Sequence, residues 1–299
     1  MDRLDTLQLF TRIVETGSFS RAADMLDIPR ATATHAIKQL EARLSTRLLE
    51  RTTRQVRPTL DGQAYYERCV QVLNELEDAE ASLRHVAANP RGVLRIDMHG
   101  THATRIVLPK IDEFRRRFPA IDLVVSSGDR LVDLVREGVD CVIRGGHPRD
   151  STLVAKRLAM MPQVICASPD YLAAVGTPHH PDELPSHQAV RFFSSNGNIA
   201  YPFELVVDGL ARTYELGGWI AVNDAETYVV SALRGCGLIQ VPRHHVEDEL
   251  RDGRLVEVLS EWQSPDMPVS ALYPYRRHLS PRVRVFVDWV GELYAKKFG

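Results

Sequence analysis

The 299-residue chain lacks any uninterrupted apolar run of about 18 residues, the length that a membrane-spanning helix needs. The chain also has no large excess of either charge, because it contains 37 Lys and Arg and 39 Asp and Glu. Cysteine is scarce, and no two cysteines have a CxxC spacing, so neither a zinc site nor a disulfide framework is expected. We expect reduced, mostly buried thiols at the four positions, Cys69, Cys141, Cys166 and Cys236.

The composition is 44% hydrophobic and 25% charged, which excludes collagen-like and largely disordered chains. The length predicts about two domains. The first ten residues place acids beside the first arginine, where a secretory signal needs a basic start and a long apolar stretch. We therefore expect a cytoplasmic protein without membrane contact.

Motifs of common catalytic sites are absent as well: the sequence has no Walker-type loop, GxSxG elbow, HExxH or GxGxxG. We predict no catalytic residue, no cofactor and no metal site. The pairs His179-His180 and His244-His245 are the weak alternative for a metal, but adjacent histidines on a helix are expected to point apart.

The near-zero net charge hides a segregation along the chain. Residues 28–60 carry seven bases against two acids, whereas residues 61–90 carry two bases against six acids. The 209 residues that follow residue 90 are almost balanced. A compact basic module attached to a nearly neutral body indicates that one end of the chain meets a polyanion.

Three helices are predicted within this basic module. Apolar residues recur at three- and four-residue steps over 4–15, and Ser18 is a suitable N-cap for a short helix over 19–27. After the break at Asp27-Ile28-Pro29, residues 30–44 form a longer helix with Ala33, Ile37, Leu40 and Leu44 inward. A short helix, a tight turn and a longer helix with a basic, hydroxyl-bearing outer face are what a helix-turn-helix requires.

Two short strands, 48–51 and 55–57, are expected to form a wing whose arginines contact backbone phosphates. A basic three-helix domain that binds protein is the alternative, but bases clustered on the third helix and the wing favour DNA. The residues predicted to bind DNA are Ser18, Ser20, Arg21, Arg30, Thr32, Thr34, His35, Lys38, Arg51, Thr52, Thr53 and Arg54.

Four separated motifs follow one another along this region. They are Gly17-Ser18-Phe19-Ser20 with Ala22-Ala23, Ile37-x-x-Leu40-Glu41-x-x-Leu44, Leu48-Leu49-x-Arg51-Thr52-Thr53-Arg54 and Thr59-x-x-Gly62. In this order they resemble the winged helix-turn-helix of LysR-type transcriptional regulators. The family usually has a serine where Pro29 stands and Ser-Arg where Thr34-His35 stands, so the resemblance implies DNA binding but not a particular base preference.

A helix without a breaker is predicted from Leu60 to about residue 88, which at 1.5 Å per residue spans about 45 Å. We expect its apolar stripe to pair with a second copy of the chain, and packing on the chain's own C-terminal domain is the alternative. The resemblance implies a homodimer through this linker, commonly assembled further into a homotetramer, and a two-fold operator. The stripe comprises Tyr66, Cys69, Leu73, Leu76, Glu80, Leu83 and Ala87, and at Glu80 the pairing is expected to be imperfect or set by register.

Residues 90–299 alternate predicted strands and helices, among them helices over 102–118 and 244–250, which indicates a mainly parallel, doubly wound α/β sheet. The pattern restarts at Met161-Pro162, and the last helix, 280–298, is expected to return to the first lobe. We place lobe I at about 91–161 and 268–299, and lobe II at about 162–267. The weaker motifs Asp140-x-x-Ile143-Arg144-Gly145-Gly146 and Gly235-x-Gly237-Leu238-Ile239-x-x-Pro242 resemble the periplasmic-binding-protein-like effector domain of the same family.

Strand-to-helix junctions would face the cleft between the lobes, where free N–H groups bind anions. Thr101, His102 and Arg144 would suit a small carboxylate or another anion, and Phe193 an apolar part of the effector. Alternatively, Thr101 only caps its helix, Arg144 pairs with Asp129 or Asp224, and the histidines are structural. The predicted effector-binding residues are Gly100, Thr101, His102, Ser127, Arg144, Phe193, Ser194, Asn223 and Asp224.

The sequence therefore predicts an α/β protein with a winged helix-turn-helix head (1–59), a long linker helix (60–89) and a two-lobed, periplasmic-binding-protein-like effector domain (90–299). Its predicted function is transcription regulation, with double-stranded promoter DNA and a small anionic effector as partners. A solute-binding or enzymatic α/β protein whose basic head docks on another protein is the alternative. The resemblance also suggests redox sensing through Cys166 or Cys236. Neither cysteine has adjacent basic residues that would stabilise a thiolate, so we do not expect this role.

Overall fold

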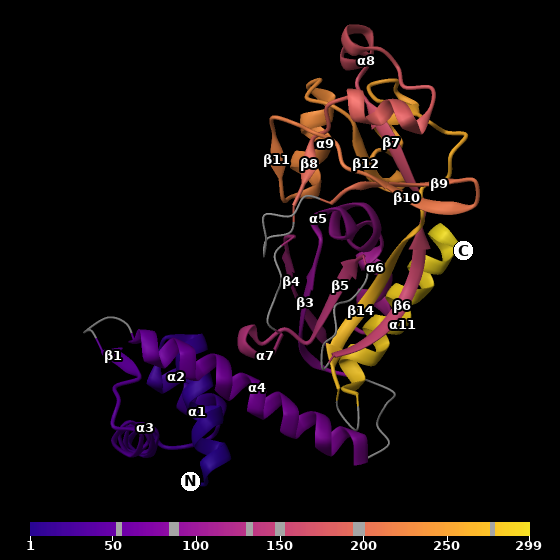
Figure 1. Cartoon of the computed structure of the whole chain (residues 1–299). Coiled ribbons are helices and arrows are strands. Elements are labelled where there is room, and N and C mark those ends of the chain that lie inside the picture. Colours follow the sequence, from indigo (N-terminus) through magenta and orange to yellow (C-terminus); the bar gives the residue numbers. More distant parts are fainter. Residues whose placement is uncertain (52–55, 84–89, 130–133, 147–152, 194–200, 276–278) are drawn as a thin grey trace. The chain divides into compact units, whose positions relative to one another are not determined.

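The computed structural model describes residues 1–51, 56–83, 90–129, 134–146, 153–193, 201–275 and 279–299. The chain divides into two compact units, Met1–Ala88 and Asn89–Gly299 (Figure 1). Among the described residues, no helix combines the length and the apolarity needed to cross a membrane.

The first unit is a helical head with a two-stranded wing. The three helices of the head agree with the prediction to within two residues at each end, because each has a local apolar period and a local end signal: the carboxylates of Asp2 and Asp5 cap the first helix reciprocally, and Gly17, at φ 62°, ends it. The elements are α1 (Arg3–Thr16), α2 (Phe19–Met25), α3 (Arg30–Leu44), β1 (Leu49–Arg51), β2 (Val56–Pro58) and α4 (Leu60–Leu83).

The core of the head differs from the prediction in two places. Leu44 was expected inward, but it is the last residue of α3 and is 37% exposed. Cys69, which the stripe on α4 includes, is buried in the head, where α4 packs on α1 and the ring of Tyr65 lies 5.5 Å from that of Phe10. The start of the linker helix is thus part of the head's own core.

Lobe I of the second unit is built on a five-stranded mixed sheet. Strand β3 pairs in parallel with β4 and β5, whereas β14 pairs antiparallel with β5 and β6. The prediction of a mainly parallel sheet is therefore wrong, because β14 returns from the far end of the chain and β6, which has no alternating pattern, was not predicted as a strand. The order is β4 (Ile121–Ser127), β3 (Gly92–Met98), β5 (Cys141–Gly145), β14 (Met267–Pro274) and β6 (Leu153–Met161).

The helices of lobe I cover this sheet. The helix predicted over 102–118 is broken by Pro109, which has no N–H to donate. The long helix α11 (Pro281–Phe298) packs along β6 and contributes to the core of this lobe (Figure 1). The broken segment comprises α5 (Gly100–His102), a π-helical turn (Ala103–Val107), a 3-10 turn (Leu108–Lys110) and α6 (Ile111–Arg117), and α7 (Leu134–Glu137) follows further on.

Lobe II has a three-stranded antiparallel sheet with β7 (Gln163–Ala167) between β12 (Ile239–Pro242) and β13 (Val256–Val258). The helix expected over 244–250 is instead a 3-10 turn, Arg243–His245, followed by a short helix, α10. The remaining elements are α8 (Pro169–Val175), a 3-10 turn (Pro181–Ser186), β8 (Arg191–Phe192), β9 (Phe203–Val207), β10 (Leu210–Tyr214), β11 (Ala221–Val222), α9 (Ala225–Leu233) and α10 (Glu247–Arg251).

Candidate functional site

Helix α3 presents a polar face to solvent and an apolar face to the core of the head. Its buried residues are Ala33, Ala36, Ile37 and Leu40. Pro29 occupies the N-cap position without a side-chain hydrogen bond, and its φ of −61° already suits the helix that follows. Of the predicted DNA-binding residues, Arg30, Thr32, His35 and Lys38 are exposed and Thr34 is half-buried.

Gln39 lies on the same exposed face and was missed by the sequence reasoning. Its Nε2 lies 2.9 Å from Nε2 of His35, one helical turn earlier, so the two side chains are within hydrogen-bond distance. A glutamine amide can pair with the edge of adenine in the major groove. Its four-residue spacing from His35 was the signal that could have identified it.

The start of α2 holds three more predicted DNA-binding residues. The hydroxyl of Ser18 accepts a hydrogen bond from the backbone N–H of Arg21 (3.3 Å) and so serves as the N-cap. Ser20 is half-buried and Arg21 is exposed. Ser18 therefore fixes the helix end, while Arg21 is open to solvent.

Two side chains outside the predicted set hold the wing on the head. Oε1 of Glu41 accepts hydrogen bonds from the N–H groups of Leu48 (2.8 Å) and Leu49 (3.1 Å). The hydroxyl of Thr59 donates to the carbonyl of Arg47 and accepts from the N–H of Gly62. Among the predicted residues at the tip, Thr52, Thr53 and Arg54 lie outside the described residues, and of Arg51 only the backbone, paired with Val56, is described.

Four histidines meet where lobe I and lobe II touch: His99 and His102 from lobe I, His244 and His245 from lobe II. We call them the histidine cluster. The ring centroid of His102 lies 5.6 Å from that of His99, 5.7 Å from His244 and 6.2 Å from His245. The rings of His244 and His245 are 4.3 Å apart, so the expectation that they point apart is wrong, because both are buried at the same junction.

Hydrogen bonds tie the cluster to both lobes. The hydroxyl of Thr101 lies 2.9 Å from Nε2 of His245, which is a direct contact between the lobes. The hydroxyl of Tyr294 on α11 lies 2.7 Å from Nδ1 of His102. Thr101 does not cap α5, whose N-cap position is His99. Both Thr101 and His102 were predicted to face an effector, and both are buried.

Arg144 forms an ion pair with Asp97, the neighbouring strand's carboxylate, and not with Asp129 or Asp224. Asp97 is 3% exposed and also accepts a hydrogen bond from the hydroxyl of Ser126 (2.6 Å). A buried carboxylate of this kind requires a compensating charge. The guanidinium of Arg144 supplies it.

The start of α9 is occupied by a carboxylate of lobe I. Oδ2 of Asp129 accepts a hydrogen bond from the N–H of Ala225 (2.7 Å), while Asp224 caps the same helix through the N–H of Thr227. Burial raises the pKa of Asp129. The helix terminus that the sequence assigned to an anionic effector is therefore filled by Asp129.

The remaining predicted effector residues lie around this junction with different exposures. Gly100, Phe193 and Asp224 are half-buried, whereas Ser127 and Asn223 are exposed. Ser194 lies outside the described residues. A separate polar cavity of about 280 Å³ lies in lobe II, where Gln163, Arg243, Glu257 and Trp262 contribute to its wall, and it includes none of the predicted residues.

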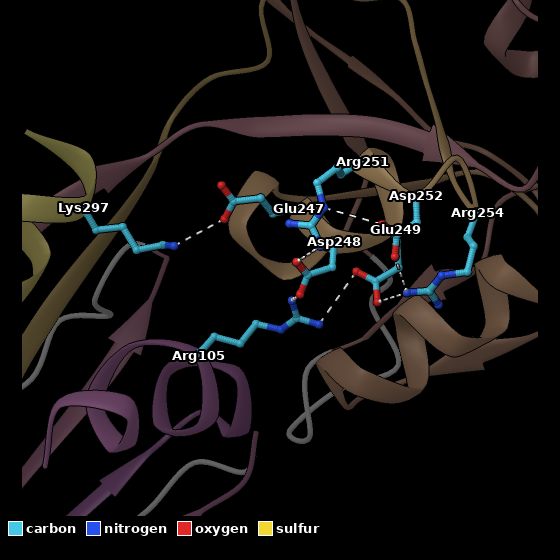
Figure 2. A network of polar contacts seen from close by, with 8 residues as sticks. All are labelled: Arg105, Glu247, Asp248, Glu249, Arg251, Asp252, Arg254 and Lys297. Atoms are coloured by element: carbon cyan, nitrogen blue, oxygen red, sulfur yellow. Dashed lines mark hydrogen bonds and ion pairs between the residues drawn. The ribbon is translucent and has the colours of Figure 1, made fainter.

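An ionic contact, which we call the clasp, joins the lobes beside the histidine cluster (Figure 2). Nη1 of Arg105 in lobe I lies 3.5 Å from Asp248, and its Nη2 lies 3.7 Å from Glu249. Nζ of Lys297, near the end of α11, lies 3.3 Å from Glu247. All three carboxylates belong to α10, so two basic side chains of lobe I, Arg105 and Lys297, form ion pairs with this helix.

Two family models cover the chain: "Bacterial regulatory helix-turn-helix protein, lysR family" matches residues 4–63, and "LysR substrate binding domain" matches residues 87–295. The transcriptional regulator YhjC of Escherichia coli is 40% identical over 97% of this chain and 97% of its own length. A transcriptional repressor of Pseudomonas aeruginosa is 36% identical over 99% and 93%.

The solved structure of CrgA, a LysR-type transcriptional regulator from Neisseria meningitidis, matches with a TM-score of 0.60 and 31% identity over 97% of this chain and 98% of that one. The matches extend over the head and the two-lobed domain alike. The chain belongs to the LysR family of transcriptional regulators, with a helix-turn-helix domain that binds DNA and a domain that binds an effector.

Proposed function

We propose that residues 1–59 read a promoter site, that residues 60–89 pair two copies of the chain, and that residues 90–299 bind a small effector between the lobes. The observation that carries the proposal is the outer face of α3, where Arg30, Thr32, His35, Lys38 and Gln39 stand on a helix whose other face is fixed in the core. A rigid helix with these side chains suits the major groove. We place this protein in the cytoplasm and assign it no catalytic role.

Pairing through the linker helix rests on the apolar stripe of α4. Leu73 and Leu76 follow Cys69 at four- and three-residue steps, and both remain partly exposed in the single chain. A second copy of α4 would cover them, as in other coiled coils. Two heads in one dimer then require two half-sites in the operator.

Promoter binding should fall steeply with salt. A head that makes six to ten phosphate contacts loses about 10³ to 10⁵ in affinity between 50 and 200 mM salt, because DNA releases counterions. Fluorescence anisotropy of the full chain with labelled fragments from its own chromosomal neighbourhood measures this loss, and the same titration gives the stoichiometry, two chains for each operator. If no fragment binds even at 50 mM salt, the proposed function is wrong.

In the same titration, Lys38→Ala should lower the ratio of promoter to scrambled-sequence affinity by about tenfold, because a base-edge contact contributes about 1–3 kcal/mol of discrimination. Lys110→Ala is the matched control, since Lys110 is an exposed lysine of lobe I. Equal loss for both fragments would instead assign Lys38 to the phosphate backbone.

For the effector we propose a small molecule with a carboxylate that replaces Asp129 at the start of α9. The N–H of Ala225 and the imidazole of His99, whose Nε2 is 3.9 Å from Oδ1 of Asp129, surround that position. Both groups suit an anion. The carboxylate of the effector would replace Asp129 as the acceptor of the Ala225 N–H. The hydrogen bond between the lobes would then be lost, and the lobes could change their relative position.

Removal of the resident carboxylate tests this exchange. Asp129→Ala should melt at a lower temperature than the parent, and 50 mM acetate should raise its melting temperature by several degrees more than 50 mM chloride does, since a ligand of the folded state stabilises it. The parent should show no such difference between the two anions. Asp122→Ala, which removes an exposed carboxylate of β4, is the control. Equal responses of the two variants to acetate would contradict the proposal.

A further inference from the structure

The histidine cluster lies across the contact between the lobes. Two of its members belong to lobe I, where His99 precedes α5 and His102 is its last residue, and the other two, His244 and His245, belong to one 3-10 turn of lobe II. Separation of the lobes would therefore pull the rings of His102 and His244 apart and break the bond from Thr101 to His245. Because of this position, the protonation of these rings is coupled to the opening of the junction between the lobes.

Three of the four members of the cluster are buried, and the cluster is poorly supplied with hydrogen-bond acceptors. His102 is 1% exposed, His244 4% and His245 6%. In the described part of the chain neither ring nitrogen of His244 has a hydrogen-bond partner, and Nδ1 of His245 has none. A charged imidazolium would need acceptors at both nitrogens, so this junction favours neutral rings.

The charged groups that face the cluster are mostly cationic. Arg105 and Lys297 face His244, Arg105 also faces His245, and Arg144 faces His99 and His102. The carboxylates near His99 are Asp129, whose Oδ1 lies 3.9 Å from Nε2 of His99, and Asp224, and each already accepts a backbone hydrogen bond at the start of α9. Near His244, Arg105 and Lys297 are themselves paired with carboxylates of α10, Asp248, Glu249 and Glu247. Tyr294 contributes a hydroxyl to His102. The four rings also face one another, so each proton added repels the next.

We propose that the histidine cluster is an acid-sensitive latch between the lobes, which keeps them together while its rings are neutral and releases them when the rings take up protons. The clasp beside it is a set of ion pairs from two bases of lobe I to three carboxylates of α10 and contains no histidine (Figure 2). The effector domain would therefore respond to mild acid through the latch without any effector.

The direction of the effect follows from the burial of the rings. Burial lowers the pKa of His99 to about 4 and that of His244 to about 3, and it holds the pKa of His102 and His245 well below the ordinary value. In the separated state the rings reach water and recover a pKa near 6.5. A base whose pKa is lower in the closed state binds its proton only after opening, so a fall in pH through 6.5 favours opening.

The size of the effect follows from the number of rings. Between pH 7.5 and pH 5.5 each histidine that charges only in the open state multiplies the opening equilibrium constant by about ten. Four such rings give a factor of up to about 10⁴.

Hydrogen exchange of the full chain, followed by mass spectrometry at pH 7.5, 6.5 and 5.5, measures the opening. Exchange is corrected for its intrinsic pH dependence and read at residues 100–107 and 243–251, on the two sides of the junction. The parent should lose protection there by at least 100-fold from pH 7.5 to pH 5.5. Residues 163–167, inside the lobe II sheet, should keep theirs, which distinguishes opening from unfolding.

His244→Gln, which keeps a neutral polar side chain at the junction, should reduce this pH response by about tenfold. The matched control is His179→Gln, an exposed histidine of the same lobe, which should leave the response unchanged. A parent whose protection at the junction changes less than fivefold overturns the latch, and so does an equal response in the parent and His244→Gln. Since the measurement uses no DNA and no effector, its failure would leave the proposed function intact.

Discussion

Replacing Arg144 by leucine should lower the melting temperature of the effector domain by about 10 °C. The substitution leaves the carboxylate of Asp97 buried with the hydroxyl of Ser126 as its remaining side-chain donor in the described structure. Removing one partner of a buried ion pair costs about 3–5 kcal/mol, and in a domain of this size each kcal/mol shifts the melting temperature by about 2–4 °C. Differential scanning calorimetry of the full chain measures the shift.

Two further variants decide whether the pair is the cause. Arg144→Leu combined with Asp97→Asn should recover most of the loss, since no buried charge remains. Lys156→Leu, which breaks an exposed pair with Asp288, should shift the melting temperature by less than about 3 °C. A single variant as stable as the parent would show that Arg144 is not required for the fold and would restore its assignment to the effector.

Gly62→Ala should destabilise the head by about 3 kcal/mol and weaken binding to every DNA fragment. A Cβ at Gly62 would stand 1.9 Å from the carbonyl oxygen of Leu48 and 2.8 Å from its carbonyl carbon. These are backbone atoms at the root of the wing, so no side-chain movement can relieve the clash, and overpacking of this kind costs about 1–3 kcal/mol. Hydrogen exchange at residues 48–51 and DNA affinity measure the loss.

Gly128→Ala is the matched control for Gly62→Ala. Nothing lies within 4 Å of the Cβ that it would add, and its backbone is not left-handed. It should leave both exchange in the head and DNA affinity unchanged. Full DNA affinity in Gly62→Ala would mean that the wing can move away from α4 without consequence for DNA binding.

The elements of the head could be predicted because their signals are local. A period of three to four residues, a cap and a left-handed glycine fix α1, and α3 begins and ends where the prediction placed it. The same pattern does not show which part of the molecule packs against the apolar face of each helix. Cys69 fits a stripe for a second helix equally well, yet it is buried against α1, and only the tertiary fold decides between the two.

The lobe junction shows the same limit more strongly. The sequence offered Asp129 and Asp224 as partners for Arg144. Its partner in the structure is Asp97, on the adjacent parallel strand β3. The histidines of the cluster come from segments far apart in the sequence, so no spacing rule connects them. Of the groups expected to bind an anionic effector, Arg144 is instead paired with Asp97 inside lobe I. Thr101 contacts His245 across the junction, and Asp129 of lobe I occupies the start of α9.

The path of the chain through the sheets also constrains how the effector domain is made. Strand β6 ends at Met161 and β14 begins at Met267, so the whole of lobe II is inserted between two neighbouring strands of the lobe I sheet. On the ribosome, the segment that completes lobe I, β14 with α11, emerges last. Lobe II can thus fold on the nascent chain before lobe I is complete. Until β14 and α11 are added, β5 is an unpaired edge of the lobe I sheet.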